Sequence, residues 1–562
     1  MKKLRILPAL LLLSIVSFSQ DYSYYNDQAK KEYENKNYYN AVDYATKSIN
    51  ITPNGAGFWW RGMGRYYLNN YTDAASDFRS ALSYYSSDNS SLGSLYYWRA
   101  ICLYNQKNYK DAIPDFESAK YYNYEDKLDI YWYLGWSNYQ VAEYKKGKES
   151  YTTAIGYTSD NATLSKLYKE RADVERKLLE NDEAIADYTK AIDYNSSNDG
   201  AFWNRALCRS AKYQYDLAVG DCTSAINLLE KQSSSPSAND LGILYSNRGL
   251  YEYDLEKYDE AKMDLKKSLE LNPNYDNANR NMADALYALK QYKDANRYYL
   301  QAASLYKSDA EKASCYNSLY WSCRTTLDYT GALSYVNSAM GMDPNNDNYY
   351  RNRAYISSIK KDYNGSMKDL NKVIAGYDKL TSLYYFDSVR LASVCKDRAL
   401  LKIKMKDNTG ALADLQKSAT LDPSDNSYYE LGRFFKQILK QDDLASVNLE
   451  KAAKKSIGKD TTSSYAYAKV IEGDKQTAIR IILKLIKENS TDSYNLKWNL
   501  HNATCIYALA GDTNKALQCL EKSLVAGFDD FDHLVNDRDL LSIVNLPQYK
   551  TILAKYKVPQ PK

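Results

Sequence analysis

Histidine is scarce in this sequence of 562 residues, which contains only His501 and His533. Neither histidine lies in a metal-binding or nucleophile motif. The sequence also lacks a CxxC pair, a glycine-rich phosphate loop and a G-x-S-x-G segment, the patterns typical of zinc ribbons, nucleotide sites and hydrolases. These absences predict a protein that is not an enzyme and that needs no metal or cofactor. A site built from carboxylates alone is the alternative, with no residue to nominate.

A strong net charge is missing as well. The formal net charge is +4, and removal of the first nineteen residues, which hold Lys2, Lys3 and Arg5, leaves 4 − 3 = +1. Such a chain has no broad electrostatic footprint for nucleic acid or anionic lipid. We therefore expect no nucleic-acid partner.

Long apolar runs are absent beyond the N-terminus. The segment MKKLRILPALLLLSIVSFSQ has basic residues, an apolar run and then small residues around Phe18, as in a secretory signal peptide cleaved after Ser19. It resembles the signal peptides of Bacteroidetes-type bacteria. With no later run of some twenty apolar residues, we expect no integral membrane span and a mature chain in the periplasm or outside the cell.

What the sequence does have is a repeat of about 34 residues. In the clearest copy, residues 242–274, apolar and small residues recur at helical spacing in two stretches around Glu256-Lys257-Tyr258-Asp259, which predicts a helical hairpin. The copy resembles the tetratricopeptide repeat, with Tyr245, Gly249, Tyr253, Ala261, Leu265, Ser268 and Pro273 at that family's positions 4, 8, 12, 20, 24, 27 and 32. This resemblance implies an all-α, right-handed superhelical solenoid.

Every unit has a small residue at position 20 of the repeat. It is alanine in twelve units and Gly147 or Ser366 in two more, and small side chains there let paired helices approach closely. We predict about fourteen units: units 1–6 in residues 20–232, units 7–10 in 240–378 and units 11–14 in 379–527. A helical cap and tail follow in residues 528–562, where Leu534, Leu540, Leu541 and Tyr549 are expected to cover the apolar end of the solenoid and His533 to be structural.

Seven units carry an arginine at position 7 and an aspartate sixteen residues later, at position 23; the other units have neither. The two positions face each other across a hairpin, so we predict ion pairs that fix its register. A row of arginines for anionic ligands is the alternative. The pairs are Arg61/Asp77, Arg99/Asp115, Arg171/Asp187, Arg205/Asp221, Arg248/Asp264, Arg353/Asp369 and Arg398/Asp414.

Aromatic residues occupy the positions that the resemblance places on the inner, concave face of the solenoid. They pack between neighbouring repeats, or they form a contact strip for a peptide, an unfolded segment or a glycan. Trp132 and Trp136, one helical turn apart, are the best anchors. The predicted binding groove consists of Trp59, Tyr66, Tyr97, Tyr104, Trp132, Trp136, Tyr139, Trp203 and Trp321.

Two further features bear on partners and redox state. Some members of this repeat family bind the C-terminal carboxylate of a chaperone through a clamp of lysine, asparagine and arginine side chains. Only Lys169 and Asn204 match the clamp positions here, so binding of such chaperones is not expected. The eight cysteines include two pairs spaced by fourteen residues, Cys208/Cys222 and Cys505/Cys519. Each pair either forms a disulfide or stays buried as thiols.

Together these features predict an exported scaffold that binds a protein or peptide partner in the cell envelope through an aromatic-lined groove. A glycan-binding module is the alternative. It needs carboxamides and carboxylates beside the rings, and only Asn26, Asp173, Asp284 and Asn317 occupy inward positions 5 and 9. An accessory region of an envelope enzyme complex is less favoured, because the repeats fill almost the whole chain.

Overall fold

A computed structural model of the protein describes residues 21–85, 88–232, 237–379, 384–455 and 462–561. The predicted signal peptide, residues 1–19, lies outside the described residues. Thirty α-helices and no strand occur among the described residues. None of the helices described is both long and apolar enough to span a bilayer.

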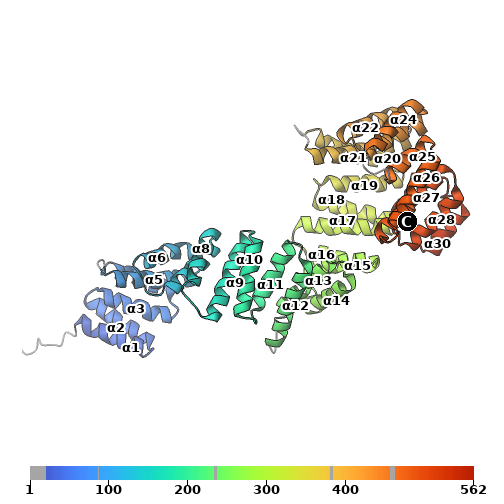
Figure 1. Cartoon of the computed structure of the whole chain (residues 1–562). Helices are drawn as coiled ribbons and strands as arrows, with labels where there is room; N and C mark the ends of the chain where they lie inside the picture. The colour runs from blue at the N-terminus through green and yellow to red at the C-terminus, as the bar shows by residue number, and fades with distance from the viewer. Residues whose placement is uncertain (1–20, 86–87, 233–236, 380–383, 456–461, 562) are drawn as a thin grey trace, which may run out of the picture. The chain divides into compact units, whose positions relative to one another are not determined.

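The chain divides into two compact units, residues 1–264 and 265–562. The first unit holds α1 to α13 and the start of α14, which crosses the division (Figure 1). Its helices are α1 (Tyr22–Glu34), α2 (Tyr38–Ile51), α3 (Gly55–Tyr67), α4 (Tyr71–Leu82), α5 (Asn89–Asn105), α6 (Tyr109–Tyr121), α7 (Lys127–Gln140), α8 (Tyr144–Ile155), α9 (Asn161–Lys177), α10 (Asn181–Tyr194), α11 (Asp199–Ala211), α12 (Tyr215–Gln232), α13 (Ala238–Asp254) and α14 (Tyr258–Leu271).

The second unit continues the same alternation of helices and ends in a different segment. A π-helical turn, η1 (Phe435–Leu439), extends α23. The helices are α15 (Asp276–Ala288), α16 (Tyr292–Leu305), α17 (Asp309–Thr325), α18 (Tyr329–Met342), α19 (Asp347–Ile359), α20 (Tyr363–Tyr377), α21 (Tyr385–Lys404), α22 (Asn408–Leu421), α23 (Asp425–Phe434), α24 (Asp442–Lys455), α25 (Ser463–Glu472), α26 (Lys475–Glu488), α27 (Ser493–Ala510) and α28 (Thr513–Val525), then α29 (Phe531–Asn536), η2 (Arg538–Leu540) and α30 (Pro547–Lys555).

Helices α1 to α28 form fourteen consecutive hairpins, which confirms the predicted all-α solenoid. Small residues at position 20 allow the close approach within each pair. All twelve alanines at this position are at most 1% exposed: Ala41, Ala74, Ala112, Ala184, Ala218, Ala261, Ala295, Ala332, Ala411, Ala445, Ala478 and Ala516.

Each hairpin turns through one residue with a positive φ angle, at position 15 of the repeat. The left-handed conformation lets the chain leave the first helix and start the second within a few residues. Only two of these residues, Gly473 and Gly511, are glycine. The others are Lys36, Asn69, Lys107, Ala142, Leu179, Tyr213, Glu256, Lys290, Leu327, Lys361, Lys406 and Lys440, with φ between 56° and 65°.

The C-terminal cap, from Phe528 to Val558, packs on the last hairpins. Leu534, Leu540 and Tyr549 are buried there, but Leu541 is 69% exposed, so its predicted core position is wrong. Leu540 ends the short η2 turn, and successive residues of such a tight turn cannot both face the core. The cap also lies beside α17, far earlier in the chain (Figure 1).

Candidate functional site

The seven predicted Arg/Asp pairs are all in contact across their hairpins. In the Arg205/Asp221 pair, Arg205 donates through Nε to Asp221 Oδ2 at 3.0 Å and through Nη2 to Oδ1 at 2.7 Å. The two side chains are 11% and 4% exposed. The same two-point contact, the geometry of a bidentate charge-assisted interaction, joins Arg61 to Asp77, Arg99 to Asp115, Arg171 to Asp187, Arg248 to Asp264, Arg353 to Asp369 and Arg398 to Asp414.

The aspartates of these pairs are buried between the two helices of each hairpin. All seven are at most 6% exposed: Asp77, Asp115, Asp187, Asp221, Asp264, Asp369 and Asp414. Three of them, Asp77, Asp221 and Asp414, also accept from a second cation, at 2.7 to 2.8 Å. Carboxylates this deeply buried cannot be reached by an external ligand. The structure therefore excludes the seven aspartates from any binding surface and places them in the hairpin core, where an unpaired charge would be costly.

Five of the arginines also reach the preceding hairpin. The remaining guanidinium nitrogen, Nη1, donates to the side-chain oxygen of position 25 in the unit before. The acceptors are Thr152 for Arg171, Thr189 for Arg205, Thr223 for Arg248, Asn337 for Arg353 and Asn371 for Arg398, at 2.7 to 3.0 Å.

An aromatic ring lies beside six of the seven guanidinium groups, three residues earlier on the same helix. The Arg205 guanidinium carbon is 5.4 Å from the centre of the Phe202 ring, within the range of cation–π attraction. The rings beside the other five arginines are Phe58, Tyr96, Tyr168, Tyr245 and Tyr350. Since carboxylates, hydroxyls or amides already engage these arginines, their arrangement suits a structural role better than binding of external anions.

The predicted groove aromatics of the first hairpins pack largely against their neighbours. Tyr97 is 6% exposed. Its ring stacks on Tyr124 at 4.2 Å and its hydroxyl donates to Asp129 at 3.1 Å. Tyr66, Tyr104, Trp59 and Trp203 are partly buried. Tyr66 packs against Trp98 at 5.1 Å, Tyr104 against Tyr133 at 4.8 Å and Trp59 against Phe78 at 5.9 Å.

A different arrangement occurs on α7 and α9. Trp132 is partly exposed, and its indole N–H donates to Glu170 Oε2 at 2.6 Å. The Lys166 ammonium lies 3.5 Å from the centre of the Trp132 ring. On the same helix, Trp136 and Tyr139 stack at 5.9 Å and are also partly exposed. We call Trp132, Trp136 and Tyr139, with Lys166 and Lys169, the α7–α9 strip.

Beside the α7–α9 strip lies Glu170, a partly buried acid whose charge depends on its neighbours. Burial raises the pKa of the Glu170 carboxyl, while Lys166 and the Trp132 N–H act in the opposite direction. The hydrogen bond fixes the orientation of the Trp132 ring, which also contacts the Lys166 ammonium and stacks with Tyr133 at 6.3 Å. A fixed, partly exposed ring of this kind loses little side-chain entropy when a partner binds.

The clamp residues Lys169 and Asn204 are occupied by the chain itself. Lys169 donates to Asp173 Oδ2 at 2.8 Å and Asn204 to Asp173 Oδ1 at 3.1 Å. Tyr188 also donates to Asp173 Oδ1, at 2.5 Å. Asp173 stands at the repeat position where the chaperone-binding pattern has asparagine, so an internal carboxylate takes the place of an external one.

The polar groups required by a glycan site are also engaged internally. Asn26 donates to Asn54 at 3.0 Å, and Asn317 accepts from Asn352 at 3.1 Å. Asp284 accepts from Arg280 at 3.1 Å and from Tyr299 at 2.6 Å. Together with Asp173, all four inward carboxamides and carboxylates have partners, which disfavours sugar recognition at these positions.

Trp321, the predicted groove residue on α17, lies beside the C-terminal cap. It is 42% exposed and borders a cavity of about 360 Å³ that is also lined by Tyr287, Arg324, Asp529 and Asp530. The cap segment therefore occupies space next to the first helices of the second unit. Sequence analysis missed this contact because the two segments are some two hundred residues apart.

Asp532 of α29 forms the centre of this contact. Its carboxylate accepts from Arg324 Nε at 2.6 Å, Tyr329 Oη at 2.9 Å and Tyr355 Oη at 2.7 Å, and the residue is 1% exposed. Three successive helices, α17 to α19, thus bind one residue of the cap. The Asp532 charge is compensated by Arg324, so the buried pair is satisfied.

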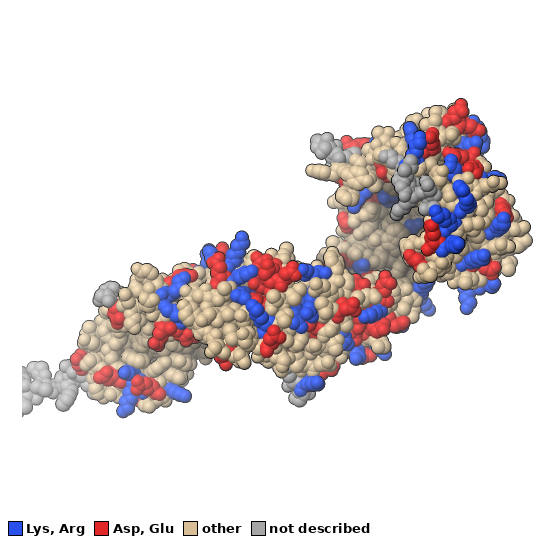
Figure 2. Space-filling view, viewed as in Figure 1, with Lys and Arg blue, Asp and Glu red and all other residues tan. Residues whose placement is uncertain are grey.

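The surface charges and the cysteines add no second site of the predicted kind. Lys and Arg are interspersed with Asp and Glu on the face shown in Figure 2. All eight cysteines are buried and none forms a disulfide, including the pairs Cys208/Cys222 and Cys505/Cys519. Burial raises the pKa of Cys208 to about 11 and that of Cys222 to about 12, which disfavours reactive thiolates.

The fold defines the class of this protein, an α-solenoid of helical hairpins. Models of the tetratricopeptide repeat match residues 61–127 and 243–275, so the chain carries tetratricopeptide repeats.

Two human proteins share parts of the sequence. DnaJ homolog subfamily C member 7 is 37% identical over 84 residues, which are 15% of this chain and 17% of that protein. RNA polymerase II-associated protein 3 is 32% identical over 127 residues, 23% of this chain and 17% of that protein. The chain therefore spans less than a fifth of the length of these relatives.

Two solved structures with related repeats are also similar to parts of the chain. The C-terminal part of a TPR repeat-containing protein from Cytophaga hutchinsonii is 19% identical, with 45% of this chain and 97% of that chain covered and a TM-score of 0.38. The first TPR of Spaghetti (RPAP3), solved with the HSP90 peptide SRMEEVD, is 30% identical, with 23% of this chain and 95% of that chain covered and a TM-score of 0.21.

Proposed function

We propose that this protein is an exported scaffold that binds a protein or peptide partner in the cell envelope, and that the α7–α9 strip makes the contact. The observation that carries the proposal is the partly exposed pair Trp132 and Trp136 on α7, one helical turn apart. Trp59, Tyr66, Tyr104 and Trp203 are also intermediate in exposure, but α7 alone carries two of the predicted groove tryptophans. Tryptophan is also among the residues that contribute most to binding at protein interfaces.

The lysines of the strip favour a particular kind of peptide. Lys166 lies over the Trp132 ring. Burial and the charge of Asp173 raise the pKa of Tyr139, while Arg176 and Lys169 of the same helix act in the opposite direction. We therefore infer an unfolded segment that carries an apolar or aromatic side chain next to an acidic one. The apolar side chain would pack on the tryptophans, and the acidic one would approach Lys166, because Lys169 is already paired with Asp173.

The proposal is tested by capture from envelope extract with the mature chain. Wild-type protein is compared with Trp132→Phe/Trp136→Ala, in which phenylalanine keeps a ring at position 132 but removes the indole N–H. The matched control is Tyr39→Ala/Tyr121→Ala, which removes two aromatics that are 76% and 78% exposed on the second helices α2 and α6. We expect a partner that the control retains and the tryptophan variant loses at least tenfold; equal capture by all three proteins would exclude the strip.

Export is tested separately by the N-terminus of the chain purified from its natural host. The signal-like segment predicts a mature protein that begins after Ser19 and fractionates with the periplasm or the culture medium. An intact Met1 in a cytosolic protein would contradict export without affecting the strip.

A further inference from the structure

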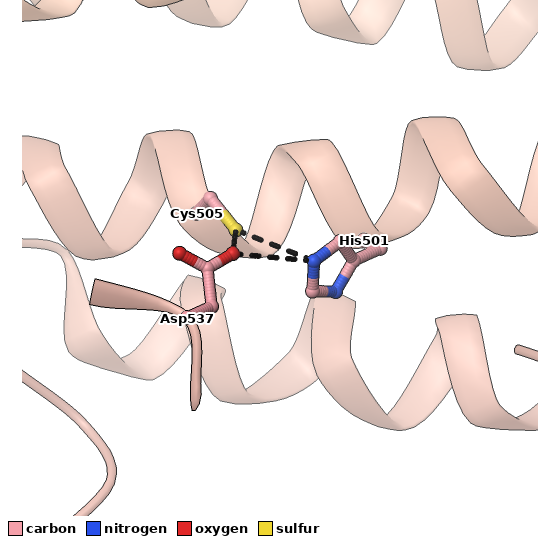
Figure 3. Close-up of side chains that lie close together, drawn as sticks. All are labelled: His501, Cys505 and Asp537. Atoms are coloured by element: carbon pink, nitrogen blue, oxygen red, sulfur yellow. Dashed lines mark hydrogen bonds and ion pairs between the residues drawn. The ribbon is translucent and has the colours of Figure 1, made fainter. Parts of the chain in front are cut away.

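Both histidines of the sequence lie at one buried carboxylate. His501 Nε2 is 3.5 Å and His533 Nε2 is 3.3 Å from Asp537 Oδ2. Cys505 Sγ is 3.3 Å from the same oxygen and 3.7 Å from His501 Nε2. In the part of the chain that the structure describes, His501, Cys505 and Asp537 are the one group of three or more such donors close enough to hold an ion together (Figure 3).

Local structure brings these side chains together. His501 and Cys505 are four residues apart on α27 and so share one face of that helix. Asp537 precedes η2 and accepts from the Asp539 backbone N–H through Oδ1 at 2.8 Å, which leaves Oδ2 to face the histidines and the thiol. The Phe528 ring stacks on the His501 imidazole at 4.4 Å and fixes its plane.

The three donor atoms have the separations of metal ligands. The donor atoms form a nearly equilateral triangle with edges of 3.3, 3.5 and 3.7 Å. A tetrahedral zinc ion separates its nitrogen, oxygen and sulfur ligands by about 3.4 to 3.6 Å, as follows from those bond lengths. The observed edges differ from these values by about 0.3 Å or less.

The His501 imidazole is poorly satisfied by hydrogen bonds. It is 1% exposed, and its Nδ1 atom is buried without a hydrogen-bond partner among the described residues. The 3.5 Å separation of Nε2 from Asp537 exceeds that of an ordinary N–H···O hydrogen bond, about 2.9 Å. A buried polar ring with neither nitrogen well bonded is costly, and a cation would satisfy Nε2.

We propose that His501 Nε2, Cys505 Sγ and Asp537 Oδ2 bind a divalent cation of the zinc class, and that His533, a half-exposed residue outside this group of three whose Nε2 lies 3.3 Å from Asp537 Oδ2, rotates to supply the fourth ligand. A thiolate and a carboxylate neutralise the two positive charges, while the histidines stay neutral, so the site has no net charge. Burial raises the pKa of the Cys505 thiol; the cation takes the place of its proton, which leaves to solvent.

Such an ion would join the cap to the last repeat. His501 and Cys505 belong to α27, whereas His533 and Asp537 belong to the segment from α29 to η2. Sequence analysis missed the cluster because its ligands are split between these two segments and include no CxxC pair. The two intervals of four residues, His501 to Cys505 and His533 to Asp537, are the only signal it had.

The test uses Co²⁺ as a spectroscopic probe for the full mature chain, reduced and freed of metal. We expect one equivalent to bind, with a thiolate-to-cobalt charge-transfer band and the strong d–d absorption of four-coordinate cobalt, and Zn²⁺ to displace it. Cys505→Ser should abolish the charge-transfer band, and Asp537→Asn and His533→Ala should each weaken binding at least tenfold. Cys519→Ser, which alters another buried thiol, is the matched control.

Several results would overturn the proposal. Absence of stoichiometric Co²⁺ binding to wild-type protein would exclude the site, as would binding without a charge-transfer band, and neither result depends on whether a variant folds. A band that survives Cys505→Ser, or one that is lost in Cys519→Ser, would exclude Cys505 as the ligand. Unchanged affinity in His533→Ala would remove His533 from the ligand set. Circular dichroism of each variant establishes that it is folded.

Discussion

Arg205 donates through Nη1 to the hydroxyl oxygen of Thr189 at 2.9 Å, across the boundary between two successive hairpins. The same guanidinium binds Asp221 within its own hairpin. One side chain thus connects three helices, α10, α11 and α12. The arginine fixes the register inside a repeat and also contributes to the stacking of one repeat on the next.

Loss of the connection between hairpins should destabilise the first unit modestly. In Thr189→Val the Arg205 Nη1 donor loses its partner, which costs about 1 kcal/mol. Thr46→Val is the matched control, because both hydroxyls also donate to a carbonyl of their own helix, Val42 for Thr46 and Ile185 for Thr189, each at 2.7 Å. Chemical denaturation measures the difference, and equal effects in the two variants would contradict the contribution of Arg205.

Loss of the ion pair inside the hairpin should cost more. Arg205→Ala leaves the buried Asp221 without its bidentate partner, and Arg209, at 2.7 Å, compensates the charge only in part. We expect a loss of about 3 kcal/mol in unfolding free energy. The single variants Arg205→Ala and Asp221→Ala and their combination form a double-mutant cycle. Additive effects would show that the two residues are not coupled, despite their contact.

The hairpins and the Arg/Asp pairs could be predicted because each recurs at a constant number of residues along the sequence. Contacts without such a constant spacing could not be predicted. Position 25 is threonine in some units and asparagine in others, so no single residue type marks it. The cap contacts at Asp532 and the cluster around Asp537 join segments far apart in the chain. The left-handed turns were also hidden, since leucine, lysine and tyrosine occupy positions where glycine is the usual signal.

The backbone conformation of a glycine determines whether its replacement by alanine stabilises or destabilises the protein. An added Cβ meets no atom within 4 Å at either Gly511 or Gly220, but only Gly511 has a positive φ, of 84°. Gly511→Ala should destabilise the protein by about 1 kcal/mol through backbone strain. Gly220→Ala, inside α12, should stabilise it by up to about 1 kcal/mol through helix propensity. Thermal denaturation of both variants checks the opposite signs, and a shift in the same direction would refute the conformational explanation.

Glu252 should make stability depend on pH near neutrality. Burial, together with the negative charge of Asp264, raises the pKa of its carboxyl to about 7, and its Oε2 atom is buried without a hydrogen-bond partner among the described residues. Because the folded state holds this proton more tightly than the unfolded state, stability falls as the pH rises from the ordinary glutamate pKa of about 4.3 to about 7.

Replacement by an uncharged side chain should remove that dependence. We expect Glu252→Gln to be more stable than wild type at pH 8, on the order of 1 kcal/mol because solvent screens a partly exposed carboxylate, and to match it more closely at pH 5. The amide hydrogen-exchange rates of α13 and α14 measure the difference. At each pH, the rate in the variant is divided by the rate in wild type. A ratio that is constant from pH 5 to pH 8 would rule out titration of Glu252.

Asp532 should control the attachment of the cap to α17, α18 and α19. In Asp532→Ala the Arg324 guanidinium stays largely buried without its carboxylate, which costs about 3 to 5 kcal/mol. We expect faster hydrogen exchange in α29 and in α17, while the first unit is unaffected. Asp309→Ala is the control on α17, because that carboxylate is 65% exposed and pairs only with Lys312 at the surface, where loss of a pair costs under about 1 kcal/mol. Exchange that rises only in α29 would show that the cap depends on Asp532 but that α17 does not depend on the cap.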